Sequence, residues 1–190
     1  MSFPDETFDA VYAIEATVHA PSLEGIYSEI FRVLKPGGVF GVYEWLMTDN
    51  YDNDNTHHRK IRLGIEQGDG ISNMEKISVA LEAVKAAGFE LQFHEDLADR
   101  DDAAPWYWPL DGDFRYCNTI TDVVTIARMT KFGRGAIHKF LGFFESLGVL
   151  PQGVQKTADS LALAADCLVA GGKEKLFTPM YLMKAVKPRK

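Results

Sequence analysis

The fold is decided by residues 8–45, which read FDAVYAIEATVHAPSLEGIYSEIFRVLKPGGVFGVYEW. The first part, 8–15, is an apolar run flanked by polar loop residues, so it predicts a buried strand. From Leu23 to Leu34, apolar residues then recur at i, i+3, i+4, i+7, i+8 and i+11, which is one face of a helix. The segment therefore opens with a strand followed by a helix.

The second half of this stretch completes one βαβ unit. Ser22 stands where an N-cap residue would begin the helix, and Pro36-Gly37-Gly38 stops it. Residues 39–45 form another apolar run, which predicts a second strand. Because a helix connects the two strands, we expect them to be parallel, with a right-handed crossover.

The predicted unit also locates a candidate site. Ligands bind beyond the carboxyl ends of the strands in open α/β sheets, and Glu15 and Glu44 end the two predicted strands. Both carboxylates should therefore lie at the same sheet edge, with His19, Tyr43 and Trp45 near them in sequence. Solvated strand ends or partners of helix termini would explain two such glutamates about equally well.

Composition limits the classes of function. The chain has 190 residues, of which 46% are hydrophobic and 25% charged, as in an ordinary soluble domain. Its 27 acidic and 20 basic residues give a net charge of −7, which argues against a general nucleic-acid binder. We expect the one basic cluster to be a solvated tail: Lys184, Lys187, Arg189 and Lys190.

Cysteine use and hydropathy add two further limits. Cys117 and Cys167 lack the spacing of metal ligands, so no metal is expected, and two lone thiols fit a reducing compartment. No apolar run reaches the roughly 18 residues of a membrane-spanning helix. Peripheral contact with a membrane stays compatible with the sequence.

Beyond residue 45, alternating signals continue. Residues 48–56 predict a solvated loop and 57–65 a short basic helix. Ser72 and Glu75 have the spacing of a capping box, which predicts a helix that starts there and ends near Gly88. Residues 89–94 alternate apolar and polar, which predicts a half-exposed strand.

Residues 99–174 break the strand–helix rhythm. They contain the aromatic segment PWYWP at 105–109 and helical patterns at 121–131, 137–147 and 161–168. Residues 176–186 predict a last strand, in which Pro179 should lie at an edge or a bulge because proline cannot donate to the ladder. The simplest topology pairs this strand antiparallel beside 89–94, with the helical block inserted between them.

We therefore expect an α/β fold with three parts, at 1–98, 99–174 and 175–190. A parallel strand that is buried on both faces needs neighbours on both sides, and only one parallel partner is evident downstream. The expectation is that the sheet is incomplete at its N-terminal side, or that another chain completes it.

Three blocks resemble the sterol C24-methyltransferases of fungi, plants and protists: FPDETFDAVYAIEATVHAP, EIFRVLKPGGVFGVYEWLMTD and HHRKIRLGIEQGDGISNM. The helix–KPGG–strand piece alone is generic to class I adenosylmethionine-dependent methyltransferases. YAIEATVHAP and YEWLMTD are more specific, because both match signature blocks of the sterol enzymes. The resemblance covers essentially the whole chain, but the family's glycine-rich E/D-x-G-x-G-x-G loop does not occur in these residues.

This resemblance implies a fold and a cofactor. The fold is the C-terminal part of a Rossmann-like class I methyltransferase sheet, with an inserted helical block typical of sterol methyltransferases. The cofactor is S-adenosylmethionine, whose main binding loop is absent from this chain, so the chain alone is expected to be inactive.

The resemblance also implies a reaction and its residues. A methyl group passes from S-adenosylmethionine to the side-chain alkene of a sterol, with Glu15 near the sulfonium or the developing cation. Glu44 or His19 would be the base or would orient it, and Ile14, Glu15 and Ala16 would contact the cofactor. Both glutamates are expected to face an apolar chamber that the late helices cover.

Aromatic side chains are the implied sterol contacts, with ordinary core packing as the competing explanation. They are Tyr12, Tyr43, Trp45, Trp106, Tyr107 and Trp108. The implied partners are a sterol, a membrane surface and a second copy of the chain, but no nucleic acid. The implied location is the cytoplasmic surface of the endoplasmic reticulum membrane or a lipid droplet.

Two other functions stay open. One is a methyltransferase for another lipophilic acceptor, such as a tocopherol-like phenol or an alkaloid. The other is a non-catalytic chain that binds a sterol or dimerises.

Overall fold

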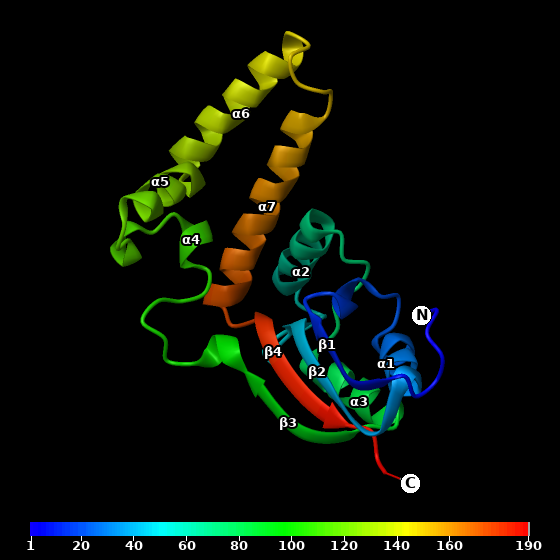
Figure 1. The fold of residues 1–190 in the computed structure, drawn as a ribbon. Helices are drawn as coiled ribbons and strands as arrows, with labels where there is room; N and C mark the ends of the chain where they lie inside the picture. Colours follow the sequence, from blue (N-terminus) through cyan, green and yellow to red (C-terminus); the bar gives the residue numbers. More distant parts are fainter. Residues whose placement is uncertain (190) are drawn as a thin grey trace. The chain divides into compact units, whose positions relative to one another are not determined.

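The protein is described from a computed structural model that covers residues 1–189 (Figure 1). The chain forms two compact units. The sheet unit consists of Met1–Asn53, Ile71–Asp101 and Lys175–Lys190, and the helical unit consists of Asp54–Gly70 and Asp102–Glu174. Lys190, which was placed in the predicted basic tail, lies outside the described residues.

The sheet unit contains four strands: β1 (Phe8–Ile14), β2 (Leu34–Met47), β3 (Glu90–Asp96) and β4 (Phe177–Val186). Their order is β1-β2-β4-β3. β1 and β2 are parallel, whereas β4 runs antiparallel to both β2 and β3. The predicted parallel βαβ unit and the antiparallel pairing of the last strand are both confirmed.

Pro179 lies at a bulge, as predicted for a proline in this strand. β4 is central in the sheet, yet its register against β2 shifts between the pairs Glu44↔Tyr181 and Leu46↔Thr178. Three steps along β4 therefore oppose two along β2. The irregularity falls where proline has no N–H to donate.

Two helices, α1 (Leu23–Val33) and α3 (Ile77–Ala86), cover one face of the sheet (Figure 1). Two short 3₁₀ turns, η1 (Thr17–His19) and η2 (Leu97–Asp99), complete the unit. Alternate residues of β2, including Phe40, Val42 and Leu46, point into the core between the sheet and the helices. The confirmed N-cap of α1 is Ser22, whose side chain accepts a hydrogen bond from the Gly25 N–H.

The prediction that β1 is buried on both faces is wrong. Val11 and Ala13 pack against the core, but Tyr12 is 79% exposed and Ile14 is 64% exposed on the opposite face. Within residues 1–189, no helix of the sheet unit covers that opposite face. Tyr12 and Ile14 therefore lie on a sheet face that is open here, whereas Val11 and Ala13 face the interior.

The predicted capping box at Ser72 is also wrong. α3 begins at Ile77, and its N-cap Lys76 makes no side-chain cap. Glu75 is held elsewhere, because its backbone C=O accepts from the Met47 N–H and its side chain accepts from Asn73. Pairing with the end of β2 keeps this segment extended, which overrides the local helix signal.

The C-terminal end of α1 shows why Lys187 does not belong to a solvated tail. The last carbonyls of a helix lack intrahelical partners. Here the Glu6 and Thr7 N–H groups bind the carbonyls of Arg32 and Val33. Lys187 Nζ is buried and donates to the carbonyls of Phe31 at 2.9 Å and Leu34 at 2.7 Å.

The helical unit contains α2 (Thr56–Asp69), α4 (Trp108–Asp111), η3 (Phe114–Tyr116), α5 (Ile120–Met129), α6 (Lys131–Ser146) and α7 (Val154–Lys173). The helical patterns at 121–131, 137–147 and 161–168 are confirmed, although α7 extends beyond both ends of the last pattern. The predicted division at 1–98, 99–174 and 175–190 placed the α2 segment with the sheet. In the structure it groups with the later helices.

Close approach of α2 to α7 explains that grouping. A Cβ atom added to Gly64 would lie 2.2 Å from Cys167 Sγ, and one added to Gly68 would lie 2.1 Å from Ala164 Cβ. Two glycines four residues apart therefore let the two helix backbones approach closely.

No described helix is both long and apolar enough to cross a bilayer.

Replacing Lys187 with methionine should destabilise the protein by about 1–3 kcal/mol. The substitution keeps an apolar stem but leaves two helix-end carbonyls without their charged donor. Lys184→Met is the control, because Lys184 is exposed on β4, three residues before Lys187, and should change stability by less than about 0.5 kcal/mol. Thermal unfolding of both variants measures the difference, and equal midpoints would contradict the capping role.

Replacing Gly68 with alanine should destabilise the helical unit by about 1–3 kcal/mol, because the Cβ atom forces α2 and α7 apart. Gly135→Ala is the matched control. Gly135 lies inside α6, and a Cβ atom added there would meet no atom within 4 Å, so alanine should stabilise by up to about 1 kcal/mol. Chemical denaturation measures both, and the same sign for the two variants would refute the close-packing explanation.

Candidate active site

The two predicted glutamates lie at the same edge of the sheet. Ile14 pairs with Tyr43 across β1 and β2, and the Glu15 N–H donates to the Tyr43 carbonyl at 2.9 Å. Glu15 therefore follows β1 beside Glu44 of β2. The expected meeting of strand ends is confirmed.

The two side chains nevertheless differ in burial. Successive strand residues alternate between faces, and Glu44 belongs to the core-facing set of β2. Glu44 is 0% exposed, whereas Glu15 is exposed. The expectation that both carboxylates face one apolar chamber is wrong for Glu44. Because β2 continues to Met47, the Glu44 side chain lies in the core between the sheet and its helices.

Glu44 is held by two hydroxyl groups. Thr17 Oγ1 of η1 and Tyr27 OH of α1 both donate to Glu44 Oε2, the latter at 3.0 Å. Burial raises the pKa of Glu44 above its ordinary value, because the interior disfavours its charge. The hydrogen bonds from Thr17 and Tyr27, with the backbone of Val18 and Trp45, oppose that shift only in part.

Glu15 is exposed at the edge, and Tyr43 beside it is half-buried. The pKa of Tyr43 is raised by partial burial, and then by the negative charges of Glu15 and Asp96, against an opposing effect of Arg100. The carboxylate of Glu15 is thus close enough to act on the Tyr43 hydroxyl. Tyr12 lies on the same sheet face, since it pairs with Gly41, two positions before Tyr43.

The chain turns sharply where β1 ends. Glu15 has a φ of 51°, in the left-handed region that non-glycine residues seldom adopt. Ala16 follows it, and η1 then places Thr17 and Val18 inside and His19 at the surface. The predicted cofactor contacts Ile14, Glu15 and Ala16 are all exposed along this turn.

Trp45 packs against the sheet and is half-buried, as Tyr43 is, whereas Tyr12 is exposed. The Trp45 ring packs edge-on against Phe177 of β4, with centroids 5.4 Å apart. Its Nε1 is buried and has no hydrogen-bond partner among residues 1–189. Trp45 therefore contributes to the sheet packing as well as to the edge.

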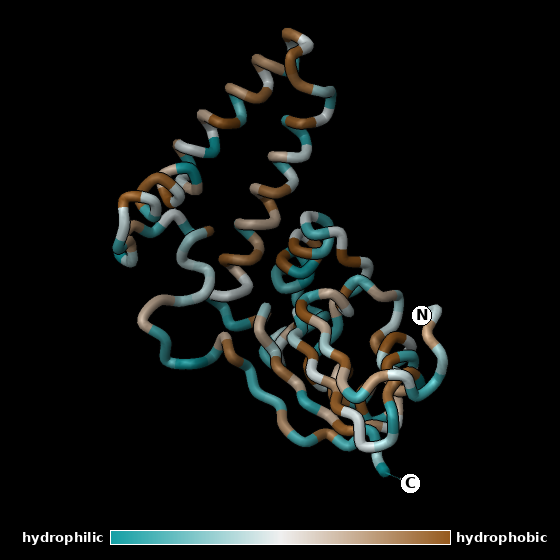
Figure 2. The backbone as a smooth tube through the Cα atoms, viewed as in Figure 1, coloured by the Kyte–Doolittle hydropathy of each residue, from teal (hydrophilic) through white to brown (hydrophobic). Residues whose placement is uncertain are grey.

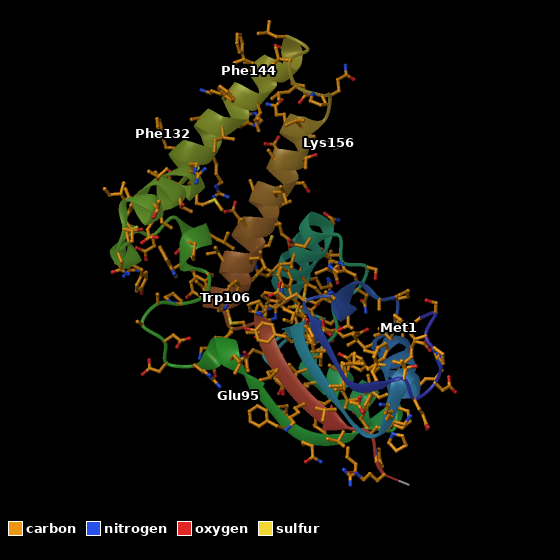
Figure 3. The ribbon with its side chains drawn as sticks, viewed as in Figure 1. Met1, Glu95, Trp106, Phe132, Phe144 and Lys156 are labelled. Atoms are coloured by element: carbon orange, nitrogen blue, oxygen red, sulfur yellow. The ribbon has the colours of Figure 1, made fainter. Side chains whose placement is uncertain are left out.

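The late aromatic residues pack within the helical unit. Trp106 and Tyr107 contact each other edge-on, with centroids 5.4 Å apart, and both crowd Gly172 of α7. Trp108 lies beside Tyr116, at 6.1 Å between centroids. Figure 3 marks Trp106 ahead of α4 and Phe132 and Phe144 along α6. The predicted sterol contacts of Trp106, Tyr107 and Trp108 stay a prediction.

The helical unit contains a cleft that sequence patterns did not indicate. It has a volume of about 740 Å³ and lies among α5, α6 and α7. Apolar residues such as Ile137, Leu161 and Ala165 form much of its wall. Two ion pairs also line it: Arg134–Asp166 at 2.7 Å and His138–Asp159 at 2.7 Å.

Two residues that hold Glu44 in place were missed by sequence reasoning. Tyr27 falls on the apolar stripe of α1 and was read as core, although a buried tyrosine hydroxyl needs a partner. Thr17 lies in the EATVH block between Glu15 and His19, where it was not assigned a role. No group of three or more metal-ligating side chains occurs in the described chain.

Comparisons with known proteins identify the family of the chain. The family model "Methyltransferase domain" matches residues 1–42, and "Sterol methyltransferase C-terminal" matches residues 124–189. The chain is 71% identical over 188 residues to the sterol 24-C-methyltransferase ERG6A of Gibberella zeae. It is 70% identical over 188 residues to the sterol 24-C-methyltransferase erg6 of Aspergillus fumigatus.

Each of these alignments covers 99% of this chain, with 49% and 50% of the two relatives. The chain thus spans about half the length of the curated relatives it matches.

Solved structures share the fold at low sequence identity. Geranyl diphosphate methyltransferase in complex with SAM has a TM-score of 0.61 at 12% identity, over 98% of this chain and 54% of that chain. A putative sarcosine dimethylglycine methyltransferase from Galdieria sulphuraria has a TM-score of 0.59 at 15% identity, over 99% of this chain and 56% of that chain. The fold is that of a Rossmann-like methyltransferase. From its sequence relatives, the chain belongs to the sterol C24-methyltransferase family.

Proposed function

We propose that the protein carrying this chain methylates the side-chain alkene of a sterol. The identity of 71% over 188 residues to a sterol 24-C-methyltransferase is the observation that supports this most strongly. The sheet edge supports it chemically. An exposed carboxylate, Glu15, lies beyond the carboxyl end of a parallel strand, where open α/β sheets bind ligands.

The edge fits a cationic cofactor. S-adenosylmethionine, when bound, supplies a methyl group on a sulfonium, and we propose that Ile14, Glu15 and Ala16 contact it. The negative charge of Glu15 favours a neighbouring cation, both the sulfonium and the cation that forms on the sterol. Held in place by the turn after β1, Glu15 can position the reactants, which alone can supply roughly 7–11 kcal/mol of a barrier.

The reaction also needs cation stabilisation and a base. The alkene electron pair forms the new carbon–carbon bond as the sulfur–methyl bond breaks, a hydride shifts, and a proton leaves the sterol. Aromatic faces of Tyr12 and Tyr43 can stabilise the sterol cation by up to about 2 kcal/mol each once water is excluded. We propose that His19, at the surface of η1, accepts this proton from the sterol. The enclosed Glu44 does not accept it.

We further propose that the protein associates peripherally with membranes or lipid droplets. The supporting observation is a set of exposed apolar side chains on α5 and α6. Figure 2 colours hydrophobic positions along both helices. The set includes Ile120, Val124, Phe132, Phe140, Phe143 and Leu147. The last four of these residues follow one another at eight-, three- and four-residue steps, which places Phe132, Phe140 and Phe143 on one face of α6 and Leu147 at its C-cap. Exposed patches of this kind mark interaction surfaces.

Glu15→Gln should lower kcat by roughly 10²-fold or more, because the variant keeps the shape but loses the charge that faces the cation. Glu24→Gln is the control, since Glu24 is an exposed acid in the first turn of α1. The measurement is transfer of labelled methyl from S-adenosylmethionine to zymosterol by the full-length protein. Full activity in Glu15→Gln would remove Glu15 from the site.

The same assay separates the alternative functions. Transfer to a tocopherol-like phenol but to no sterol would favour another lipophilic acceptor. Calorimetric heat with zymosterol, without heat from S-adenosylmethionine and without turnover, would favour a non-catalytic sterol binder. Either result would overturn the proposed reaction.

The double change Phe132→Ser and Phe143→Ser should lower binding to phosphatidylcholine vesicles by roughly tenfold or more. Burying one phenylalanine side chain is worth about 1.5–3 kcal/mol, so two of them dominate a peripheral contact. Lys156→Ser is the control, as an exposed residue of α7. Flotation with vesicles measures the bound fraction, and unchanged binding by the double variant would exclude this face.

A further inference from the structure

Glu44 is a buried acid that the proposed reaction does not use. It is completely enclosed, and no lysine, arginine or histidine of residues 1–189 pairs with it. The other enclosed acid, Glu66, instead pairs with Arg62 on its own helix at 2.9 Å. Burying an acid without a cation is costly, so an arrangement of this kind calls for an explanation.

The contacts of Glu44 join three elements at one atom. Oε2 accepts from Thr17 of η1 and from Tyr27 of α1, while Glu44 itself belongs to β2. Tyr27 is fully buried and packs its ring edge-on against Phe40, with centroids 5.3 Å apart. Glu44 and Tyr27 therefore form a fixed base, to which Thr17 is attached.

Thr17 is the link between this base and the edge. It lies two residues after Glu15 and two before His19, inside the turn that runs from β1 into η1. Glu15 is held in a left-handed conformation that a free chain seldom populates. The turn is also held by the buried side chain of Val18 and by the Glu15 N–H bond to the Tyr43 carbonyl, whereas the side chains of Glu15 and His19 lie at the surface.

We propose that Glu44 is a positioning residue for methyl transfer, acting through Thr17 to fix Glu15 and His19 at the sheet edge. This inference rests on the proposed function of that edge. Glu44 touches neither reactant, since its side chain lies on the sheet face away from Tyr43. It orients the turn as a hydrogen-bond acceptor, and it neither takes nor gives a proton in the reaction.

A raised pKa agrees with that role, because a neutral acid can occupy the interior at lower cost than a charged one. The other titratable groups around it are Tyr27 of α1, Tyr181 across the strand pair on β4, and Glu15 at the end of β1. None of these is a cation. The acceptor oxygen, rather than the charge, is what the turn requires.

Glutamine and alanine at position 44 test this inference against a role as base. A glutamine oxygen still accepts from Thr17 and Tyr27, so Glu44→Gln should keep kcat within about threefold, whereas Glu44→Ala should lower it by roughly 10²-fold. Sterol methylation by the full-length protein is the readout. A loss in Glu44→Gln as large as in Glu44→Ala would identify Glu44 as the base and overturn the proposal.

The two hydroxyl donors give a matched pair that separates positioning from stability. Thr17→Val and Tyr27→Phe each remove one donor to the same oxygen, and both should lower the unfolding midpoint. Only Thr17→Val should lower kcat, by roughly ten- to hundredfold, with KM for the sterol changed less than threefold. Equal kcat values in the two variants would reduce the cluster to a structural contact.

Hydrogen exchange gives a readout that is independent of activity. The amides of residues 15–19 should exchange faster in Thr17→Val than in Tyr27→Phe, while those of α1 should change in the opposite order. If the wild-type protein methylates no sterol, the proposed function fails, and the exchange result still decides whether Glu44 holds the turn. Identical exchange of residues 15–19 in both variants would overturn the proposal.

Discussion

The structure of the candidate site depends on one buried carboxyl group. Glu44 accepts hydrogen bonds from Thr17 and Tyr27 at a single oxygen, and so joins β2, the η1 turn and α1. Because the interior disfavours the charge of Glu44, each hydrogen bond donated to its carboxyl group is stronger than it would be in water. This contact connects a well-packed core to the turn that carries the proposed site residues Glu15 and His19, whose side chains are exposed.

Much of the fold follows from local patterns. The apolar stripe of α1, its Ser22 cap and the two flanking apolar runs predict the βαβ unit, because periodicity and capping are properties of the chain itself. The position of Pro179 at a bulge likewise follows from its missing N–H. Where the signal failed, at Ser72, tertiary pairing of Glu75 with Met47 overrode it.

The site itself was only partly predictable. Strand order placed Glu15 and Glu44 at one edge, but the burial of Glu44 depends on how far β2 continues past it. Once the end of β2 is known, its alternation predicts that Glu44 faces the core together with Phe40, Val42 and Leu46. Lys187 shows the same limit, since its carbonyl partners are 153 and 156 residues away in sequence. The cleft among α5, α6 and α7 depends on helix spacing, which no stripe specifies.

The central claim is that Glu44 holds the turn at residues 15–19. The most direct test is a pH titration by NMR of the protein with carboxyl-labelled glutamate, which follows the Glu44 carboxyl carbon and the amides of residues 15–19 together. The account predicts that Glu44 loses its proton well above the ordinary glutamate pKa of about 4.3, and that the amides of residues 15–19 shift in the same step. Titration of Glu44 without any response from the amides of that turn would contradict it.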